Sequence, residues 1–173
     1  YLDFCNHTTV DINGNQISSV DLSGLTNLKY FDCSNYGFNN VIGAHGNTLP
    51  SLSVNHLTNL EELKCSKNNI TALAINNLIH LANLDCSYNL LTNLDLVGLS
   101  GLTTLNYAHN QIANLNMVGL VNLTDLDCSN NNITTLNLSN MANLARLSCN
   151  SNALTTLNLN GLTLISDLSC DTN

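Results

Sequence analysis

The stretch LDCSNNNITTLNL, residues 126–138, places Cys128 between leucines and follows it with a run of asparagines and a second leucine-containing half. The same phrase recurs as LEELKCSKNNITAL (60–73), LANLDCSYNLLTNL (81–94) and LARLSCNSNALTTL (144–157). The cysteine therefore belongs to a sequence period, and that period decides the fold.

Alignment on the cysteine gives a step of 21 residues, apart from one step of 32. Such a period is typical of a solenoid, because one repeat cannot bury its apolar side alone and buries it against its neighbours. Apolar and polar residues alternate as in a strand, and no run has the 3.6-residue periodicity of a helix. We expect a single domain, residues 1–173, of about eight coils with little or no helix. The equivalent positions are Ile12, Cys33, Cys65, Cys86, Tyr107, Cys128, Cys149 and Cys170.

The pattern LxxLxCSxNxL is similar to the highly conserved segment of leucine-rich repeats. Together with the LxxLxL half that follows, it resembles the 21-residue bacterial subclass called IRREKO, whose pattern allows cysteine at this position. The resemblance covers nearly the whole chain and implies a parallel sheet on the concave face, with short strands or extended turns on the convex face. It also implies an extracellular or cell-surface bacterial protein, or the cytoplasm of a host cell for an effector. Members of this family serve as recognition scaffolds, so the resemblance indicates no particular reaction.

An asparagine lies three residues after most of the cysteine positions. Its amide both donates and accepts hydrogen bonds, so a stack of such side chains can satisfy the backbone groups that each bend leaves unpaired. We expect these asparagines to be structural. They are Asn15, Asn68, Asn89, Asn110, Asn131, Asn152 and Asn173.

The seven cysteines are open to three interpretations: cross-linking, metal binding and packing. Adjacent parallel strands lie about 4.8 Å apart, further than the roughly 3.8 Å between the Cβ atoms of a disulfide. A row of inward thiols also cannot converge on one tetrahedral metal ion. We therefore favour packing, with cysteine acting as a small buried hydrophobe, and expect no cofactor. Cys5 and Cys170 fall at the two ends and escape this reasoning.

The 32-residue step adds eleven residues after Cys33. The repeat resumes at Asn47, so the extra segment spans about residues 35–46 and carries Tyr36, Phe38 and His45 among glycines and asparagines. A loop at the end of a concave strand is a frequent recognition element, although a surface insertion of this length is also tolerated at little entropic cost.

Tyr107 stands where the other repeats carry cysteine. Either Ala108 and the flexible Met117 make room for the ring, or the strand bulges at this point. A functional alternative is that Tyr107 and His109 shape a concave pocket with Tyr88 of the preceding coil.

Residues on either side of the inward strand position should face solvent on the concave side, and they form an acidic stripe. One row is Asp11, Asp32, Lys64, Asp85, Asn106, Asp127, Ser148 and Ser169, and the other is Tyr30, Glu62, Asn83, Thr104, Asp125, Arg146 and Asp167. Such a stripe suits a cationic partner or Ca²⁺, and it also serves solubility.

The net charge of −8 and the four permanent cations disfavour nucleic acid and anionic membranes, and no run of about 18 apolar residues predicts membrane insertion. No GxSxG, HExxH or phosphate-loop motif is present. We expect a non-enzymatic module that binds a protein or glycan, and the chain is expected to be a fragment of a longer protein. The alternatives are a structural spacer and an ice- or mineral-binding face. The candidate partner-binding residues are Tyr30, Asp32, Tyr36, Phe38, His45, Glu62, Asp85, Tyr88, His109, Asp125 and Asp127.

Overall fold

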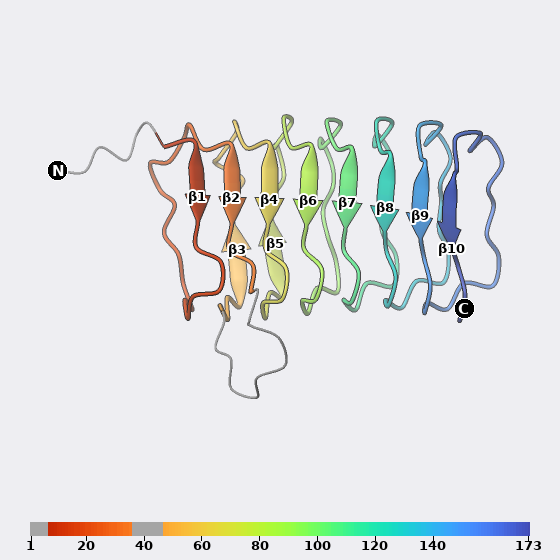
Figure 1. The fold of residues 1–173 in the computed structure, drawn as a ribbon, viewed down its shortest axis with the longest axis horizontal. Coiled ribbons are helices and arrows are strands. Elements are labelled where there is room, and N and C mark those ends of the chain that lie inside the picture. The colour runs from red at the N-terminus through yellow and green to blue at the C-terminus, as the bar shows by residue number, and fades with distance from the viewer. Residues whose placement is uncertain (1–6, 36–46) are drawn as a thin grey trace.

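The computed structural model describes residues 7–35 and 47–173, and in this part of the chain every regular element is a strand. Eight strands form one parallel sheet in the order β1-β2-β4-β6-β7-β8-β9-β10 (Figure 1). They are β1 (Thr9–Asp11), β2 (Tyr30–Asp32), β4 (Glu62–Lys64), β6 (Asn83–Asp85), β7 (Thr104–Asn106), β8 (Asp125–Asp127), β9 (Arg146–Ser148) and β10 (Asp167–Ser169). The predicted solenoid with eight strand-bearing coils is confirmed.

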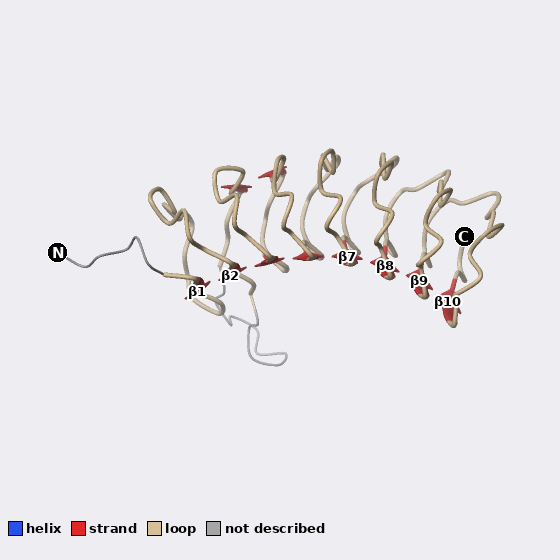
Figure 2. Cartoon of the chain, turned by 90° about the horizontal axis from the view of Figure 1, so that it is seen from above, coloured by secondary structure: helices blue, strands red, loops and turns tan. Residues whose placement is uncertain are grey.

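A second, two-stranded parallel sheet pairs β3 (Ser51–Ser53) with β5 (Ala72–Ala74) on the opposite side of the solenoid. The stack curves, and the eight-stranded sheet lines its concave side while the second halves of the coils fan out on the convex side (Figure 2). Among the described residues there is no helix that could span a membrane.

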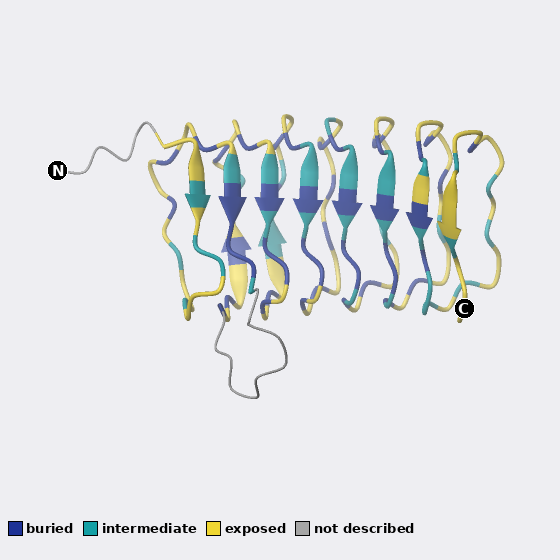
Figure 3. Ribbon diagram, in the orientation of Figure 1, coloured by how far each residue is buried: buried dark blue, intermediate teal, exposed yellow. Residues whose placement is uncertain are grey.

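Equivalent residues of successive repeats pair with one another throughout the long sheet. Leu63 of β4 pairs with Leu84 of β6, for example, and Leu105 of β7 pairs with Leu126 of β8. Within the eight-stranded sheet, the middle residue of each strand from β2 to β9 is buried, whereas β1 and β10 at the ends of the stack are more exposed (Figure 3). A register shift of one residue would turn these side chains to the solvent, so the hydrophobic pattern fixes the pairing.

The asparagine row is a continuous hydrogen-bonded ladder, as predicted. In a typical coil, Asn89 Nδ2 lies 3.0, 3.1 and 3.1 Å from the carbonyl oxygens of Cys65, Cys86 and Ser87. Its Oδ1 accepts a hydrogen bond of 3.0 Å from the backbone N–H of Ile70. Each asparagine therefore joins its own turn to the coil before it.

The coil after Cys33 returns to this ladder at the predicted residue. Asn47 Nδ2 donates to the carbonyl oxygens of Ile12 and Cys33, at 2.8 and 3.0 Å, and Asn47 Oδ1 accepts from Ile17 N at 3.0 Å. Asn47 is therefore the ladder residue of the second coil, and the segment that separates it from Asn35 is additional to the repeat.

Tyr107 is fully buried, and the strand before it does not bulge. Strand β7 keeps the regular register, and Tyr107 N donates to Asp127 O at 3.0 Å like its equivalents in neighbouring coils. The ring is therefore accommodated within the core, and Ala108 and Met117 of the same coil are buried as well. Its hydroxyl is buried beside the Cys128 thiol and, among the described residues, has no hydrogen bond of standard geometry.

Candidate binding face

The concave sheet carries two rows of mostly polar side chains, one on each side of the buried middle residue. Seven carboxylates and two cations lie in these rows, which gives the face a net charge of −5. The carboxylates are those of Asp11, Asp32, Glu62, Asp85, Asp125, Asp127 and Asp167, and the cations are those of Lys64 and Arg146. The predicted acidic stripe is present as a geometric feature.

The row that precedes the cysteine position also stabilises the turn that follows it. Oδ1 of Asp85 accepts hydrogen bonds from the backbone N–H and the hydroxyl of Ser87, at 3.0 and 2.7 Å, and Asp127 does the same with Ser129. Asn106 replaces them in its own coil, where Oδ1 accepts from Ala108 N at 3.0 Å. These are Asx turns, in which Oδ1 of each aspartate accepts the hydrogen bonds that close the turn.

The N-terminal half of the face is filled by its own side chains. The Tyr30 hydroxyl donates to Asp32 Oδ2 at 3.2 Å, Lys64 Nζ lies 5.3 Å from the centroid of the Tyr30 ring, and Lys64 pairs with Glu62 at 2.7 Å. Burial, and then the Asp32 carboxylate, raise the pKa of Tyr30. Asp32 also accepts from Ser34 N at 2.9 Å and is only 3% exposed, so the expectation that it faces solvent is wrong. Its two oxygens are used inside the fold.

The C-terminal half of the face is hollow, because its strands carry small polar side chains. A shallow depression of about 550 Å³ lies over β7 to β10, with Thr104, Asn106, Ser148 and Ser169 among its lining residues. A smaller depression of about 370 Å³ lies over β4, β6 and β7, and the two share Thr104 and Asn106. Together they form a groove along the sheet. Its lining includes Glu62, Asp85, Asp125, Asp127 and Asp167.

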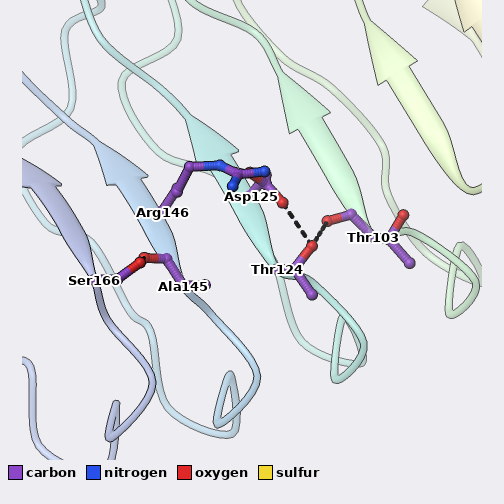
Figure 4. A network of polar contacts seen from close by, with 6 residues as sticks. All are labelled: Thr103, Thr124, Asp125, Ala145, Arg146 and Ser166. Carbon is purple, nitrogen blue, oxygen red and sulfur yellow. Dashed lines mark hydrogen bonds and ion pairs between the residues drawn. The ribbon is translucent and has the colours of Figure 1, made fainter.

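A network of polar contacts fixes two charged side chains in this groove (Figure 4). Arg146 Nε on β9 pairs with Asp125 Oδ1 on β8. The Thr124 hydroxyl lies 2.6 Å from Asp125 Oδ2 and 3.0 Å from the carbonyl oxygen of Thr103. Sequence reasoning did not select Arg146 as a site residue, although it is the only arginine in the chain and interrupts an acidic row.

Tyr88 and His109 meet at the turn that follows the concave strands. Their rings stack with centroids 3.9 Å apart and planes 14° apart, and Lys67 Nζ lies 5.8 Å from the Tyr88 centroid. All three residues have a positive φ of 53° to 54°, in the left-handed region that non-glycine residues rarely adopt. The predicted proximity of Tyr88 and His109 is therefore found, whereas the buried Tyr107 does not share a surface pocket with them.

The structure divides the candidate residues into three groups. Tyr30 and Asp32 lie in the filled half of the face, Asp125 and Asp127 line the hollow half, and Glu62 and Asp85 line the smaller depression between them. Tyr88 and His109 form the stacked pair at the edge. The remaining three candidates, Tyr36, Phe38 and His45, lie outside the described residues, and their role stays a prediction.

The cysteines form the buried row that packing predicts. Cys33, Cys65, Cys86, Cys128 and Cys149 are free and buried, and Cys170 is free and exposed, whereas Cys5 lies outside the described residues. Burial is the main cause that raises the pKa of Cys33 and Cys128 to about 12 and that of Cys149 to about 11. The buried thiols therefore stay protonated at neutral pH, when they are poor nucleophiles and poor metal ligands. No cluster of potential metal ligands occurs among the described residues.

The parallel concave sheet, the asparagine ladder and the 21-residue repeat together define the leucine-rich-repeat fold. No protein-family model and no curated protein matches the sequence. Among solved structures, the functional domain of InlJ from Listeria monocytogenes is 28% identical, with a TM-score of 0.69 over 96% of this chain and 44% of that one. Its description states that it includes a cysteine ladder.

Two further bacterial structures share the fold. A leucine-rich-repeat protein of Leptospira interrogans is 23% identical, with a TM-score of 0.80 over 95% of this chain and 43% of that one. YopM from Yersinia enterocolitica is 25% identical, with a TM-score of 0.78 over 96% of this chain and 33% of that one. The predicted resemblance to bacterial leucine-rich-repeat proteins is confirmed, and the chain spans less than half the length of each of these three structures.

Proposed function

We propose that this domain is a non-enzymatic binding module that recognises a protein partner with a cationic surface on its concave face. The observation that carries the proposal is the acidic groove over β4 and β6 to β10, where carboxylates surround an open depression lined by small polar side chains. A face with one predominant sign of charge attracts a partner of the opposite sign and discriminates against others.

The neighbouring structures support a binding role, because the solenoids of InlJ and YopM belong to a class of recognition scaffolds. A protein partner suits the face better than a glycan. Sugar binding commonly uses the open face of an aromatic ring, but the Tyr88 ring stacks on His109 and lies near the Lys67 ammonium. We further propose an extracellular or cell-surface location, by analogy with these neighbours.

The chain offers a matched pair of variants for testing the proposal. Asp85→Asn with Asp127→Asn removes two charges from the concave face and retains the Asx turns, since Asn106 makes the same contact. Asp21→Asn with Asp95→Asn removes two charges from the other half of the coil. There, Asp95 Oδ1 accepts from Val97 N at 3.1 Å and Asn116 Oδ1 accepts from Val118 N at 3.1 Å. Both double variants should fold, and they carry equal net charge.

The experiment captures proteins on the immobilised domain and identifies them by mass spectrometry for the wild type and for both variants. Support requires a protein that the wild type and the Asp21/Asp95 variant retain and that the Asp85/Asp127 variant loses. Equal capture by all three forms would show that binding, if any, does not use the concave charge, and the proposal would fail.

A further inference from the structure

Arg146 is the one cation in the hollow half of the concave face, and its neighbours hold it in place. Its Nε is paired with Asp125 Oδ1, while the second oxygen of Asp125 lies 2.6 Å from the Thr124 hydroxyl. The Arg146 side chain nevertheless remains 64% exposed. A side chain that is both oriented and exposed loses less conformational entropy when it binds a ligand than a free one would.

The hydrogen-bonding capacity of Arg146 exceeds what Asp125 can use. A guanidinium carries five N–H donors and no acceptor, and Asp125 contributes one oxygen to Nε and the other to the Thr124 contact. The planar fork of the guanidinium matches a carboxylate in a bidentate arrangement. The ligand group that fits this position best is therefore a carboxylate, although the surrounding face is acidic.

The charges beside Arg146 define the pattern that a partner must carry. Asp125 on β8 and Asp167 on β10 are its register partners, so the row reads negative, positive, negative on three successive strands. These strands lie about 4.8 Å apart. A complementary partner presents positive, negative and positive groups at that spacing.

The spacing favours a helix over an extended segment. A helix rises about 1.5 Å per residue, so side chains three or four residues apart advance by about 4.5–6 Å along its axis. Side chains on one face of an extended segment are about 6.6 Å apart, which does not match the strand spacing. The depression of about 550 Å³ over β7 to β10, lined by Ser148 and Ser169, leaves room for such side chains.

We propose that Arg146 is a specificity-determining residue that binds a carboxylate on a partner helix, between two basic residues that meet Asp125 and Asp167. The partner helix carries Lys or Arg, then Asp or Glu, then Lys or Arg at positions i, i+4 and i+7. This inference rests on the proposed function, because it assigns one contact within the concave groove.

The test uses two synthetic alanine-based helical peptides of equal composition. The first carries a basic, an acidic and a basic residue at positions i, i+4 and i+7. In the second, the acidic residue is moved to the opposite face of the helix. Affinity is measured by NMR titration of the labelled domain at low salt. We expect the first peptide to bind at least about tenfold more tightly and to shift the backbone signals of β7 to β10. Arg146→Gln should abolish this preference. Lys64→Gln, which removes the other concave cation, is the matched control and should retain it.

A charge reversal separates a direct contact from a structural effect. Arg146→Glu should prefer a third peptide, with lysine at the central position, over the first peptide. Suppose that both original peptides bind the wild type equally and that the double variant Asp85→Asn with Asp127→Asn binds both more weakly. The acidic face then binds cations, but the role proposed for Arg146 is wrong. Retention of the preference in Arg146→Gln, or no binding of either peptide, would also overturn the inference.

Discussion

The asparagine ladder makes a quantitative prediction at Asn110, in the middle of the stack. Asn110→Ala removes three donated hydrogen bonds, to the carbonyl oxygens of Cys86, Tyr107 and Ala108, and one bond of 2.9 Å accepted from Leu91 N. The asparagine is 9% exposed, so water cannot simply replace it. The four lost contacts are unequal in cost, and the structure shows which one matters most.

The three carbonyl oxygens keep a second donor when Asn110 is removed. Asn89 Nδ2 still donates to Cys86 O at 3.1 Å, Asn131 Nδ2 to Tyr107 O at 3.0 Å, and Tyr88 N to Ala108 O at 2.9 Å. The Leu91 N–H loses the bond that Asn110 supplies, and a buried unsatisfied donor costs about 1–3 kcal/mol. With the weakened carbonyl contacts and the small cavity, we expect the free energy of unfolding to fall by about 3 kcal/mol.

Urea unfolding followed by circular dichroism measures this loss, and hydrogen exchange at the Leu91 amide locates it. The control is Asn114→Ala, which truncates an exposed asparagine of the same coil and should change stability by less than about 0.5 kcal/mol. The hydrogen-bond reasoning is refuted if Asn110→Ala costs no more than Asn114→Ala, or if the Leu91 amide keeps its protection.

Three further predictions concern the cysteine row, its interruption and the inserted segment. Because burial raises the pKa of Cys33, Cys128 and Cys149 to about 12, 12 and 11, the native state keeps protons that the unfolded thiols lose near pH 9. Stability should therefore be intact below pH 9 and fall as the pH rises towards 11 to 12, as urea midpoints across pH 7–11 would show. Tyr107→Phe removes a buried hydroxyl without a standard hydrogen bond and should raise the free energy of unfolding by about 1 kcal/mol. Tyr107→Cys leaves a cavity and should lower the free energy of unfolding by about 3 kcal/mol. Thermal melts measure both changes. Deletion of residues 36–46 joins Asn35 to Asn47 and restores a 21-residue step, so the melting temperature should be unchanged. If the deletion variant no longer captures a partner that the wild type captures, recognition is assigned to that segment.

The fold could be read from the sequence because every level of the pattern repeats. The cysteine step set the register of the sheet, and in the regular coils the residue three positions later is the ladder asparagine. In the coil with the longer step, the ladder residue is Asn47, 14 residues after Cys33, where the repeat was expected to resume. The buried position of Cys128 followed from alternation with leucine. Because each local structural preference recurs in every coil, weak local signals add up to one consistent fold.

The site was less predictable because it depends on side-chain size and on contacts within single coils. The turn-forming role of Asp85 and Asp127 was missed, although the recurring DCS phrase places an acceptor two residues before a small residue, as an Asx turn requires. The burial of Asp32 involves the Tyr30 hydroxyl, which donates to its second oxygen, in addition to the turn contact with Ser34 that Asp85 and Asp127 also make with their own serines. The hollow half results from the small residues Ser148 and Ser169, whose effect appears only when neighbouring strands are assembled.

The Asx turns also bear on whether the concave charge is needed for stability. Asn106 makes the turn contact at 3.0 Å, the same distance as Asp127, so the fold itself does not need a carboxylate there. Asp11 and Asp32 are nevertheless register partners on adjacent strands, where like charges are destabilising.

In the second turn of the coil, amides make this contact more often than carboxylates. Asp95 occupies this turn position in one coil, and an asparagine occupies it in the three coils that follow. In each case the side-chain oxygen accepts a hydrogen bond from the backbone N–H two residues further on; the three asparagines are Asn116, Asn137 and Asn158. The concave turns of the neighbouring coils retain aspartate at positions 85 and 127, where an amide would serve the turn equally well. A requirement for turn formation would act alike on both sides of the coil, so it does not account for the aspartates on the concave side. Their presence there agrees with the proposal that this face meets a cationic partner.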